Sequence, residues 1–250
     1  MVSTLNHLID ETVAGKTIFY NFYTERQKQE DPTKIYAGLF FYRGKPGTPF
    51  AIVCPGGGFS YVGSLQEGFP LAQEISRTGL NAFVIRYRVG EQSATEDLAV
   101  AITYIFRNAE TLGVGTQGYS LWGGSAGARM VGNIALRGVS DYGGSDLPKP
   151  ATVVIAYTGQ SNYSSDFPPA FITVSVDDPI ANVATVDRRV RNLRNARVEV
   201  EYRRYKNAGH GFGPGVGADA QGWVEYAIEF WRNHASENAR MLRTDGVRAH

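Results

Sequence analysis

The sequence predicts an α/β fold in which a mostly parallel sheet carries helices on both faces. Three observations support this prediction. Short strand-like segments alternate with amphipathic segments along the chain, the order that is typical of βα units. Residues 50–54 and 82–87 are nearly continuous apolar runs, as expected for strands that are buried on both faces of a parallel sheet. Between residues 98 and 112, apolar side chains recur at helical spacing.

Eight segments have the character of strands. The first two are rich in aromatic and β-branched residues and predict a leading antiparallel pair. A polar stretch that ends in the turn signal Asp31-Pro32 separates them. The eight segments are residues 17–23, 34–42, 50–54, 82–87, 118–122, 151–157, 170–176 and 197–204. They predict one eight-stranded sheet whose parallel strands are joined by right-handed crossovers.

The best-supported helix begins at Ser93-Ala94-Thr95-Glu96, which has the pattern of a capping box. The apolar residues that follow at helical spacing are Leu98, Ile102, Ile105, Ala109 and Leu112, and Gly113 is the expected stop. Further helices are expected at residues 66–77, 126–137, 181–195 and 221–234.

Composition limits the class of protein. The chain has 250 residues, of which 43% are hydrophobic and 20% charged, so it is neither disordered nor collagen-like. We expect one domain over residues 1–250, with residues 1–45 forming a leader and the antiparallel pair. The net charge is only +1, which argues against a nucleic-acid partner. No apolar run approaches the ~20 residues of a membrane span.

Cysteine and histidine are too few for several kinds of site. Cys54 is the single cysteine, so an internal disulfide or a cysteine-rich zinc site is excluded. Because there is also no histidine cluster, we expect no metal and no cofactor. The N-terminus lacks the basic and apolar regions of a signal peptide, which favours a cytoplasmic protein unless a leader was removed from a secreted one. The oligomeric state stays open, a homo-oligomer included.

Residues 123–127, Gly-Gly-Ser-Ala-Gly, form a G-x-S-x-G pattern between a predicted strand and a predicted helix. Glycines at these positions permit a sharp turn that holds Ser125 in a strained backbone conformation. The serine oxygen then lies at a helix N-terminus, where free N–H groups favour developing negative charge. A tight turn with an ordinary capping serine is the alternative.

A second glycine motif, Cys54-Pro55-Gly56-Gly57-Gly58-Phe59, follows an earlier predicted strand. Successive glycines let backbone N–H groups turn toward a substrate oxygen, as an oxyanion hole requires. A phosphate-binding loop is a poor alternative, because neither Gly-Lys-Ser/Thr nor G-x-G-x-x-G with an acidic partner is present.

These two motifs and the later Gly-His-Gly-Phe resemble those of the α/β-hydrolase superfamily, and more closely those of small carboxylesterases and acetyl esterases of the hormone-sensitive-lipase and acetylxylan-esterase type. The resemblance covers residues 50–233. It implies an α/β-hydrolase fold and a serine hydrolase that cleaves short-chain esters, acetylated sugars included. It assigns the oxyanion hole to the N–H groups of Gly57, Gly58 and Ala126. Pro55 departs from the usual pattern, which has a histidine before the glycines.

Ser125 needs a base and an acid for this chemistry. Of the four histidines, His7, His210, His234 and His250, only His210 lies in a glycine-rich loop just after the last predicted strand, where the base of this fold belongs. The acid should follow the preceding strand, at Asp177-Asp178-Pro179. We favour Asp178, with Asp177 as the alternative. Cys54 ends a strand and lies outside the G-x-S-x-G turn at residues 123–127, which we call the elbow, so we interpret it as a small buried residue.

The segment at residues 158–169 is too short for a helical lid, so we expect a minimal or absent lid and an open, shallow site. Aromatic side chains on neighbouring loops either bound a pocket for the substrate or merely cover the sheet edge. These candidates are Phe59, Tyr61, Tyr157 and Phe212, with Tyr163 and Phe167 beside them. The expected partner is a small ester or an acetylated carbohydrate. A serine peptidase or amidase and a non-catalytic ligand-binding relative are the alternative functions.

Overall fold

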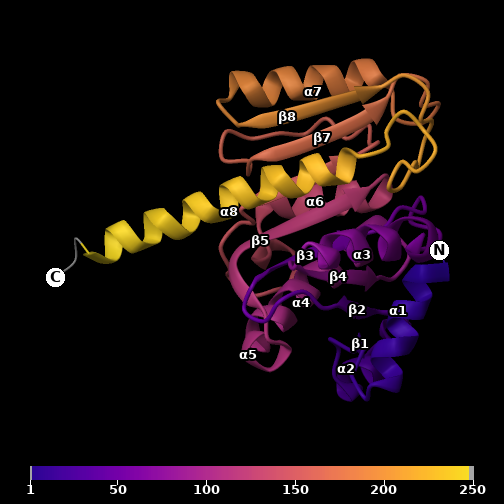
Figure 1. The fold of residues 1–250 in the computed structure, drawn as a ribbon, viewed down its shortest axis with the longest axis vertical. Helices are drawn as coiled ribbons and strands as arrows, with labels where there is room; N and C mark the ends of the chain where they lie inside the picture. Colours follow the sequence, from indigo (N-terminus) through magenta and orange to yellow (C-terminus); the bar gives the residue numbers. More distant parts are fainter. Residues whose placement is uncertain (1, 248–250) are drawn as a thin grey trace.

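The computed structural model describes residues 2–247, and eight strands form one sheet in it (Figure 1). Their spatial order is β1-β2-β4-β3-β5-β6-β7-β8. The strands are β1 (Phe19–Tyr20), β2 (Gly38–Tyr42), β3 (Pro49–Cys54), β4 (Asn81–Arg86), β5 (Gly115–Gly124), β6 (Thr152–Ala156), β7 (Ala170–Ser175) and β8 (Val200–Tyr205). β2 pairs antiparallel with β1 and β4, and the other pairs are parallel. The predicted eight-stranded, mostly parallel sheet with a leading antiparallel pair is confirmed.

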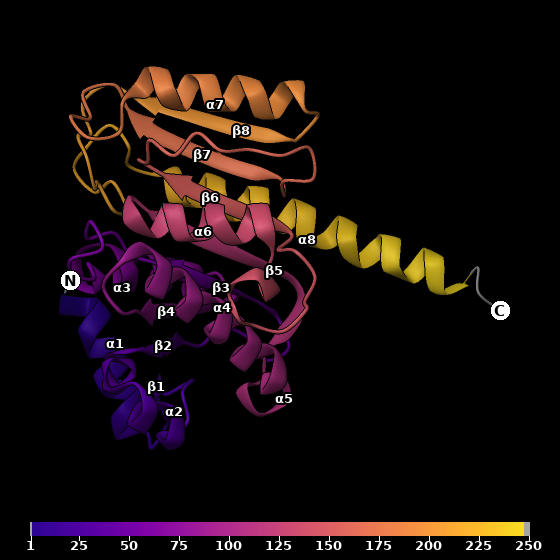
Figure 2. The same ribbon diagram turned by 180° about the vertical axis from the view of Figure 1, so that it is seen from behind.

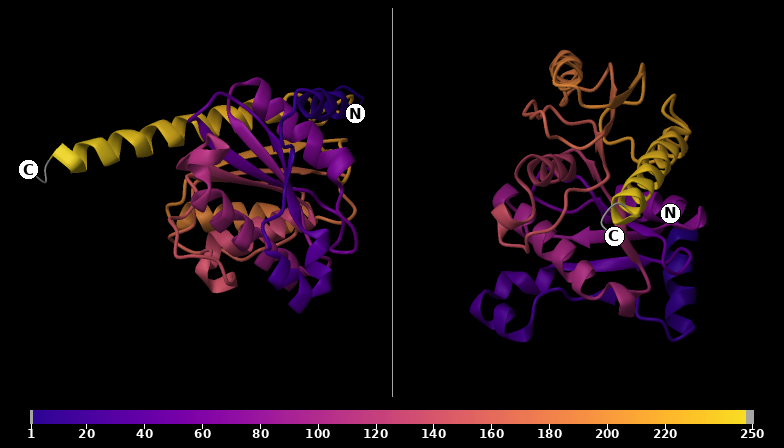
Figure 3. Two further views of the ribbon diagram at one scale, coloured as in Figure 1. Left: turned by 90° about the horizontal axis from the view of Figure 1, so that it is seen from below. Right: turned by 90° about the vertical axis from the view of Figure 1, so that its left-hand side faces the viewer.

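Helices cover both faces of this sheet. α3 (Phe69–Arg77) and α8 (Trp223–Val247) lie on the face seen in Figure 1, while α4 (Glu91–Arg107) and α6 (Ala126–Arg137) lie on the face seen in Figure 2. α7 (Val183–Asn195) packs on β7 and β8. The far end of α8 extends beyond the sheet (Figure 3). None of the helices in the described part of the chain is long and apolar enough to cross a bilayer.

The buried strands explain why the chain folds this way. All five residues of β6 and all six of β7 are buried, and burying apolar surface at about 25 cal/mol per Å² is the main favourable term in folding. Three tryptophans, Trp122 on β5 and Trp223 and Trp231 on α8, pack together between helix and sheet. The indole N–H of Trp231 donates to the Gly118 carbonyl at 2.7 Å, so this large side chain leaves no unpaired polar group in the core.

The predicted capping box at Ser93–Glu96 is wrong. α4 begins at Glu91 with Gly90 as its N-cap, three residues before the predicted cap Ser93. Gly90 has a φ of +92°, which favours glycine, and its N–H donates to the carbonyl of Phe59 at 3.0 Å. This contact with a loop distant in sequence fixes where the helix starts. The predicted stop at Gly113 is confirmed, although the helix breaks at Asn108 and continues as α5 (Ala109–Leu112).

The first 36 residues contain helices that the sequence analysis did not predict. They are α1 (Val2–Val13), α2 (Glu25–Glu30) and a 3₁₀ turn, Pro32–Tyr36. Asp31 caps the 3₁₀ turn by accepting the N–H of Thr33 at 3.1 Å, so β2 begins at Gly38 rather than at residue 34. A separate π-helical turn, Ser64–Gly68, precedes α3. The predicted helix at residues 126–137 matches α6.

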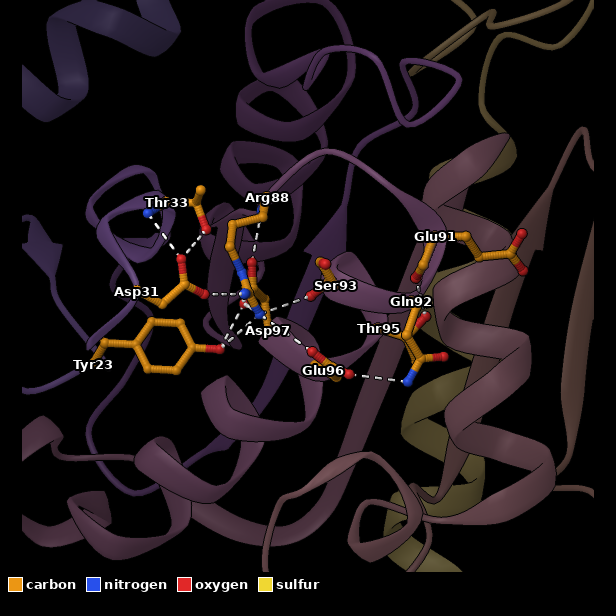
Figure 4. A network of polar contacts seen from close by, with 10 residues as sticks. All are labelled: Tyr23, Asp31, Thr33, Arg88, Glu91, Gln92, Ser93, Thr95, Glu96 and Asp97. Atoms are coloured by element: carbon orange, nitrogen blue, oxygen red, sulfur yellow. Dashed lines mark hydrogen bonds and ion pairs between the residues drawn. The ribbon is translucent and has the colours of Figure 1, made fainter. Parts of the chain in front are cut away.

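A buried network anchors this N-terminal segment to the loop between β4 and α4 (Figure 4). Asp97 is fully buried. Its Oδ1 accepts the hydroxyl of Tyr23 at 2.6 Å and the Nε–H of Arg88 at 2.9 Å, and its Oδ2 accepts the Arg88 backbone N–H at 2.7 Å. Arg88 also reaches Asp31 at 2.9 Å. The carboxylate is therefore satisfied by charge-assisted bonds from two separate segments.

Replacing Asp97 by alanine should lower the free energy of unfolding by about 3–5 kcal/mol, because Arg88 would lose its buried counter-charge. Chemical denaturation followed by circular dichroism measures this change. The matched control is Glu30→Ala, which breaks the exposed Arg26–Glu30 pair and should cost no more than about 0.5 kcal/mol. Equal losses in the two variants would show that the network contributes no more than a surface ion pair.

Candidate active site

Ser125 occupies the turn between β5 and α6, at the carboxyl edge of the sheet. Its φ of +50° and ψ of −113° are a strained combination for a residue with a side chain. The flanking glycines make this turn possible. A β-carbon built at Gly127 would lie 1.9 Å from the carbonyl oxygen of Cys54 on β3, and one built at Gly123 would lie 2.5 Å from the backbone nitrogen of Ala128.

His210 and Asp178 complete a chain of hydrogen bonds that begins at Ser125. The Oγ of Ser125 lies 2.9 Å from Nε2 of His210, and Nδ1 of the same ring lies 2.8 Å from Oδ2 of Asp178. Since an ionised carboxylate can only accept, Nδ1–H donates to Asp178, and the unprotonated Nε2 accepts the hydroxyl of Ser125. The three residues follow three different strands, β5, β7 and β8, and meet at one edge.

Asp177 and Asp178 have different surroundings. The Asp178 side chain is fully buried, and its Oδ1 also accepts the N–H groups of Ile180 and Ala181, both at 2.8 Å. The exposed Asp177 accepts the hydroxyl of Ser175 and, at 2.9 Å, the N–H of Gly209. Asp178 therefore contacts the imidazole ring, while Asp177 fixes the loop that carries it.

Two further bonds hold the His210 loop. The Ala208 N–H donates to Oγ of Ser175 at 2.9 Å, and the indole N–H of Trp223 donates to the Gly213 carbonyl at 2.8 Å. Gly209 and Gly211 have φ values of +67° and +68°, a backbone region that glycine enters without strain. The glycine-rich sequence lets the loop turn sharply, and these bonds select one conformation.

The candidate oxyanion donors lie on the loop after β3 and at the N-terminus of α6. The N–H groups of Gly57, Gly58 and Ala126 donate to no acceptor in the part of the chain that the structure describes. Gly58 and Ala126 line the same pocket as Ser125, whereas Gly57 does not.

Several bonds hold the backbone of this loop. The Tyr87 hydroxyl donates to the Pro55 carbonyl at 2.6 Å. The Gly63 N–H donates to the Gly56 carbonyl at 2.9 Å, and the Gly90 N–H reaches Phe59. Anchors from two segments, the loop between β4 and α4 and the turn at Gly63, thus fix a glycine-rich stretch that would otherwise be flexible.

A pocket of about 560 Å³ opens beside Ser125 and His210. Of the four aromatic residues expected to bound it, Phe59 and Tyr157 line it and Tyr61 and Phe212 do not. Tyr61 is 65% exposed. Phe212 packs instead against Tyr157 and Trp223.

The remaining two aromatics of the sequence analysis are elsewhere. Tyr163 is 46% exposed, and Phe167 is buried beneath the guanidinium group of Arg189. Residues 158–169 contain no helix, so no helical lid covers the pocket.

One wall of the pocket is polar and was not predicted. The guanidinium of Arg129 lies 2.6 Å from the carboxylate of Glu91, and the amide of Gln160 donates to Oδ1 of Asn133 at 2.9 Å. Arg129 and Asn133 follow Ser125 by one and two turns of α6, so helical spacing from the predicted serine was a usable signal. Glu91 and Gln160 join through tertiary packing and gave no such signal.

The other candidate residues lie away from this chemistry. Cys54 is buried, and burial raises the pKa of its thiol, as fits a small core residue. His7 stacks on Tyr42, and His234 lies on α8, while His250 falls outside the described residues. Among the side chains that the structure describes, no three of His, Cys, Asp or Glu gather in a group suited to a metal ion.

Replacing Gly127 by alanine should destabilise the protein by at least about 1–3 kcal/mol, because the new methyl group collides with the backbone of β3. Thermal and urea unfolding measure the loss. Gly159→Ala is the matched control, since a β-carbon there meets nothing within 4 Å and should change stability by less than about 0.5 kcal/mol. A Gly127 variant as stable as the control would contradict the close approach of the elbow to β3.

We compared the chain with known proteins to identify its fold. No protein-family model and no curated protein sequence matches the chain. Many solved structures match it, among them the following three. An α/β hydrolase enzyme from a Medee basin deep-sea metagenome library has a TM-score of 0.71 and 22% identity, over 80% of this chain and 93% of that one. An acetyl ester-xyloside bifunctional hydrolase from Caldicellulosiruptor lactoaceticus has a TM-score of 0.73 and 19% sequence identity, and the match covers 86% of this chain and 95% of that one. A carboxylesterase from Lactobacillus plantarum has a TM-score of 0.66 and 19% sequence identity, and the match covers 79% of this chain and 92% of that one. The expectation from the sequence motifs is confirmed: the chain has the α/β-hydrolase fold.

Proposed function

We propose that this protein is a serine carboxylesterase that hydrolyses short-chain esters. The observation that carries the proposal is the continuous hydrogen-bond chain from Oγ of Ser125 through the His210 ring to the buried carboxylate of Asp178. A serine hydroxyl is a weak nucleophile until a base removes its proton, and this geometry supplies the base at 2.9 Å.

The reaction has two steps. In the first, Oγ of Ser125 attacks the ester carbonyl carbon, and its proton passes to Nε2 of His210. The tetrahedral intermediate collapses, the alcohol leaves with that proton, and an acyl-serine remains. In the second step, water attacks the acyl-serine while His210 takes its proton. His210 then returns that proton to Oγ as the bond between the acyl carbon and Ser125 breaks, so that the carboxylic acid is released and the free serine is restored.

The surrounding groups stabilise the charges that develop. The N–H groups of Gly57, Gly58 and Ala126 are assigned to the oxyanion, and each such donor contributes about 2.7–4 kcal/mol to lowering the barrier. Asp178 keeps the imidazole in the required tautomer and stabilises the imidazolium that forms. Because the Asp178 side chain is fully buried, little water competes for this interaction.

The pocket supports a small acyl group and a polar alcohol. Residues 158–169 add no helical lid that could enclose a long acyl chain. The polar wall, which we define as Glu91, Arg129, Asn133 and Gln160, offers donors and acceptors to the hydroxyl groups of a sugar. The compared acetyl ester-xyloside hydrolase is consistent with an acetylated carbohydrate as the substrate here.

Ser125→Ala should leave a folded protein with ester hydrolysis near background. Asp178→Asn should lower kcat by about 10⁴-fold, because an amide favours the wrong imidazole tautomer. Asp177→Asn is the matched control and should keep kcat within about tenfold, since Asp177 contacts only the loop. Initial rates on p-nitrophenyl acetate measure all three. A greater loss in the Asp177 variant would reverse the assignment of the acid, and unchanged turnover by Ser125→Ala would refute the nucleophile.

Substrate preference should follow the pocket. On p-nitrophenyl esters, kcat/KM should fall at least tenfold from acetate to octanoate, and the corresponding anilide should turn over far more slowly. Asn133→Leu should raise KM for acetylated xylose by about 3–10-fold through the loss of one hydrogen bond worth about 0.5–1.5 kcal/mol, and leave KM for p-nitrophenyl acetate nearly unchanged. A preference for octanoate, or faster amide hydrolysis, would contradict the proposed substrate class.

A further inference from the structure

Glu67 is a buried carboxyl group that the mechanism above leaves without a role. It lies in the π-helical turn Ser64–Gly68 and is only 9% exposed. In the described part of the chain it forms no ion pair. Burial raises the pKa of its carboxyl group, and a hydrogen bond from the Gly56 N–H acts in the opposite direction. A buried acid without a cationic partner is costly, so its position beside the candidate site calls for a physical reason.

The carboxyl group lies where three segments of the site meet. Its Oε2 accepts the Gly56 N–H at 2.8 Å. A β-carbon built at Gly124, in the elbow, would lie 2.5 Å from Oε2, and one built at Gly211, beside His210, would lie 3.6 Å from Oε1. The Tyr157 hydroxyl is also near, but without the geometry of a full hydrogen bond. The bond from Gly56 is therefore the defined contact.

This bond completes the anchoring of Gly56. The Gly56 carbonyl already accepts the Gly63 N–H at 2.9 Å. In a planar trans peptide, the C=O of one residue and the N–H of the next point in opposite directions. The bond from Gly63 therefore sets the direction of the Gly57 N–H, and the bond to Glu67 holds the preceding Pro55–Gly56 peptide. With both peptide planes held, the two backbone dihedral angles of Gly56 are fixed.

We propose that Glu67 is a positioning residue for the oxyanion hole, and that it acts by accepting the Gly56 N–H. The inference rests on the proposed esterase function. It also accounts for the departure at Pro55, because the loop is held by the Glu67 carboxyl group from one side and by the Tyr87 hydroxyl from another. The acceptor, rather than the negative charge, is the essential property.

Two nearly isosteric variants separate these properties. Glu67→Met keeps the length of the side chain but removes the acceptor, whereas Glu67→Gln keeps an acceptor oxygen and removes the charge. The control is Gln73→Leu, which removes a buried polar group away from the site. Gln73 is a residue of α3 whose side-chain amide donates to the Ser3 carbonyl. The measurements are kcat and KM on p-nitrophenyl acetate, and the Ki of a trifluoromethyl ketone, whose adduct with serine places an oxyanion in the hole. Circular dichroism gives the folded fraction of each variant.

Removing one oxyanion donor typically lowers kcat by about 10²–10³-fold. A donor that is displaced rather than removed should lower kcat by an amount near or below the smaller of these values. We expect Glu67→Met to lower kcat by about 30–100-fold, to change KM less than about threefold, and to weaken the ketone in proportion to kcat. The kcat, KM and Ki of Glu67→Gln should stay within about fivefold of the wild-type values, and those of Gln73→Leu within about twofold. Where the Met variant does not fold, Glu67→Asp, which withdraws the acceptor by one methylene group, takes its place with the same expectation.

Three results would overturn the inference: a folded Met or Asp variant with normal kcat, a Gln variant as impaired as the Met variant, or a loss confined to KM. Failure of the underlying function is distinguishable, because wild type itself would then hydrolyse no ester and would not bind the ketone covalently.

Discussion

The close approach of the elbow to β3 is the constraint on which the site depends. Only a residue without a side chain fits at Gly127 against the Cys54 carbonyl, and this packing forces Ser125 into its positive φ. The hydroxyl then stands above the carboxyl edge of the sheet, where the loops after β3, β7 and β8 converge. Strain of about 1–3 kcal/mol at one residue is compatible with folding because the buried strands on both sides over-determine the turn.

The loops around Ser125 are held in position by hydrogen bonds between residues that lie outside the reacting groups. The two adjacent carboxylates have different roles in the structure. Asp178 contacts the imidazole of His210, and Asp177 accepts a hydrogen bond from the loop that carries this histidine. The glycine loop is held in the same manner by Tyr87, by Gly63 and by Glu67 of the π-helical turn that follows the loop. Glycines supply the backbone conformations that the site needs, and distant polar groups select one of them. Loss of a supporting bond should therefore affect geometry before it affects the overall fold.

The sequence predicted most of the sheet, because strands buried on both faces leave continuous apolar runs, and it predicted Ser125 and His210 as candidates because their glycine-rich turns are local patterns. What it missed depends on contacts between distant segments. The start of α4 is set by Gly90 bonding Phe59 rather than by a serine cap. Glu67 and Gln160 lie in no pattern that separates them from surface residues, because only the packed chain brings them to Gly56 and Asn133.

The central claim is that Ser125 is made nucleophilic by His210. Covalent labelling with a fluorophosphonate, followed by mass spectrometry of the digested protein, tests it most directly. The account predicts one adduct per chain, on Ser125, that forms on wild type, is absent from Ser125→Ala and is slowed at least a hundredfold in His210→Ala. No adduct on the folded wild type, an adduct on another residue, or equal labelling rates in wild type and His210→Ala would contradict it.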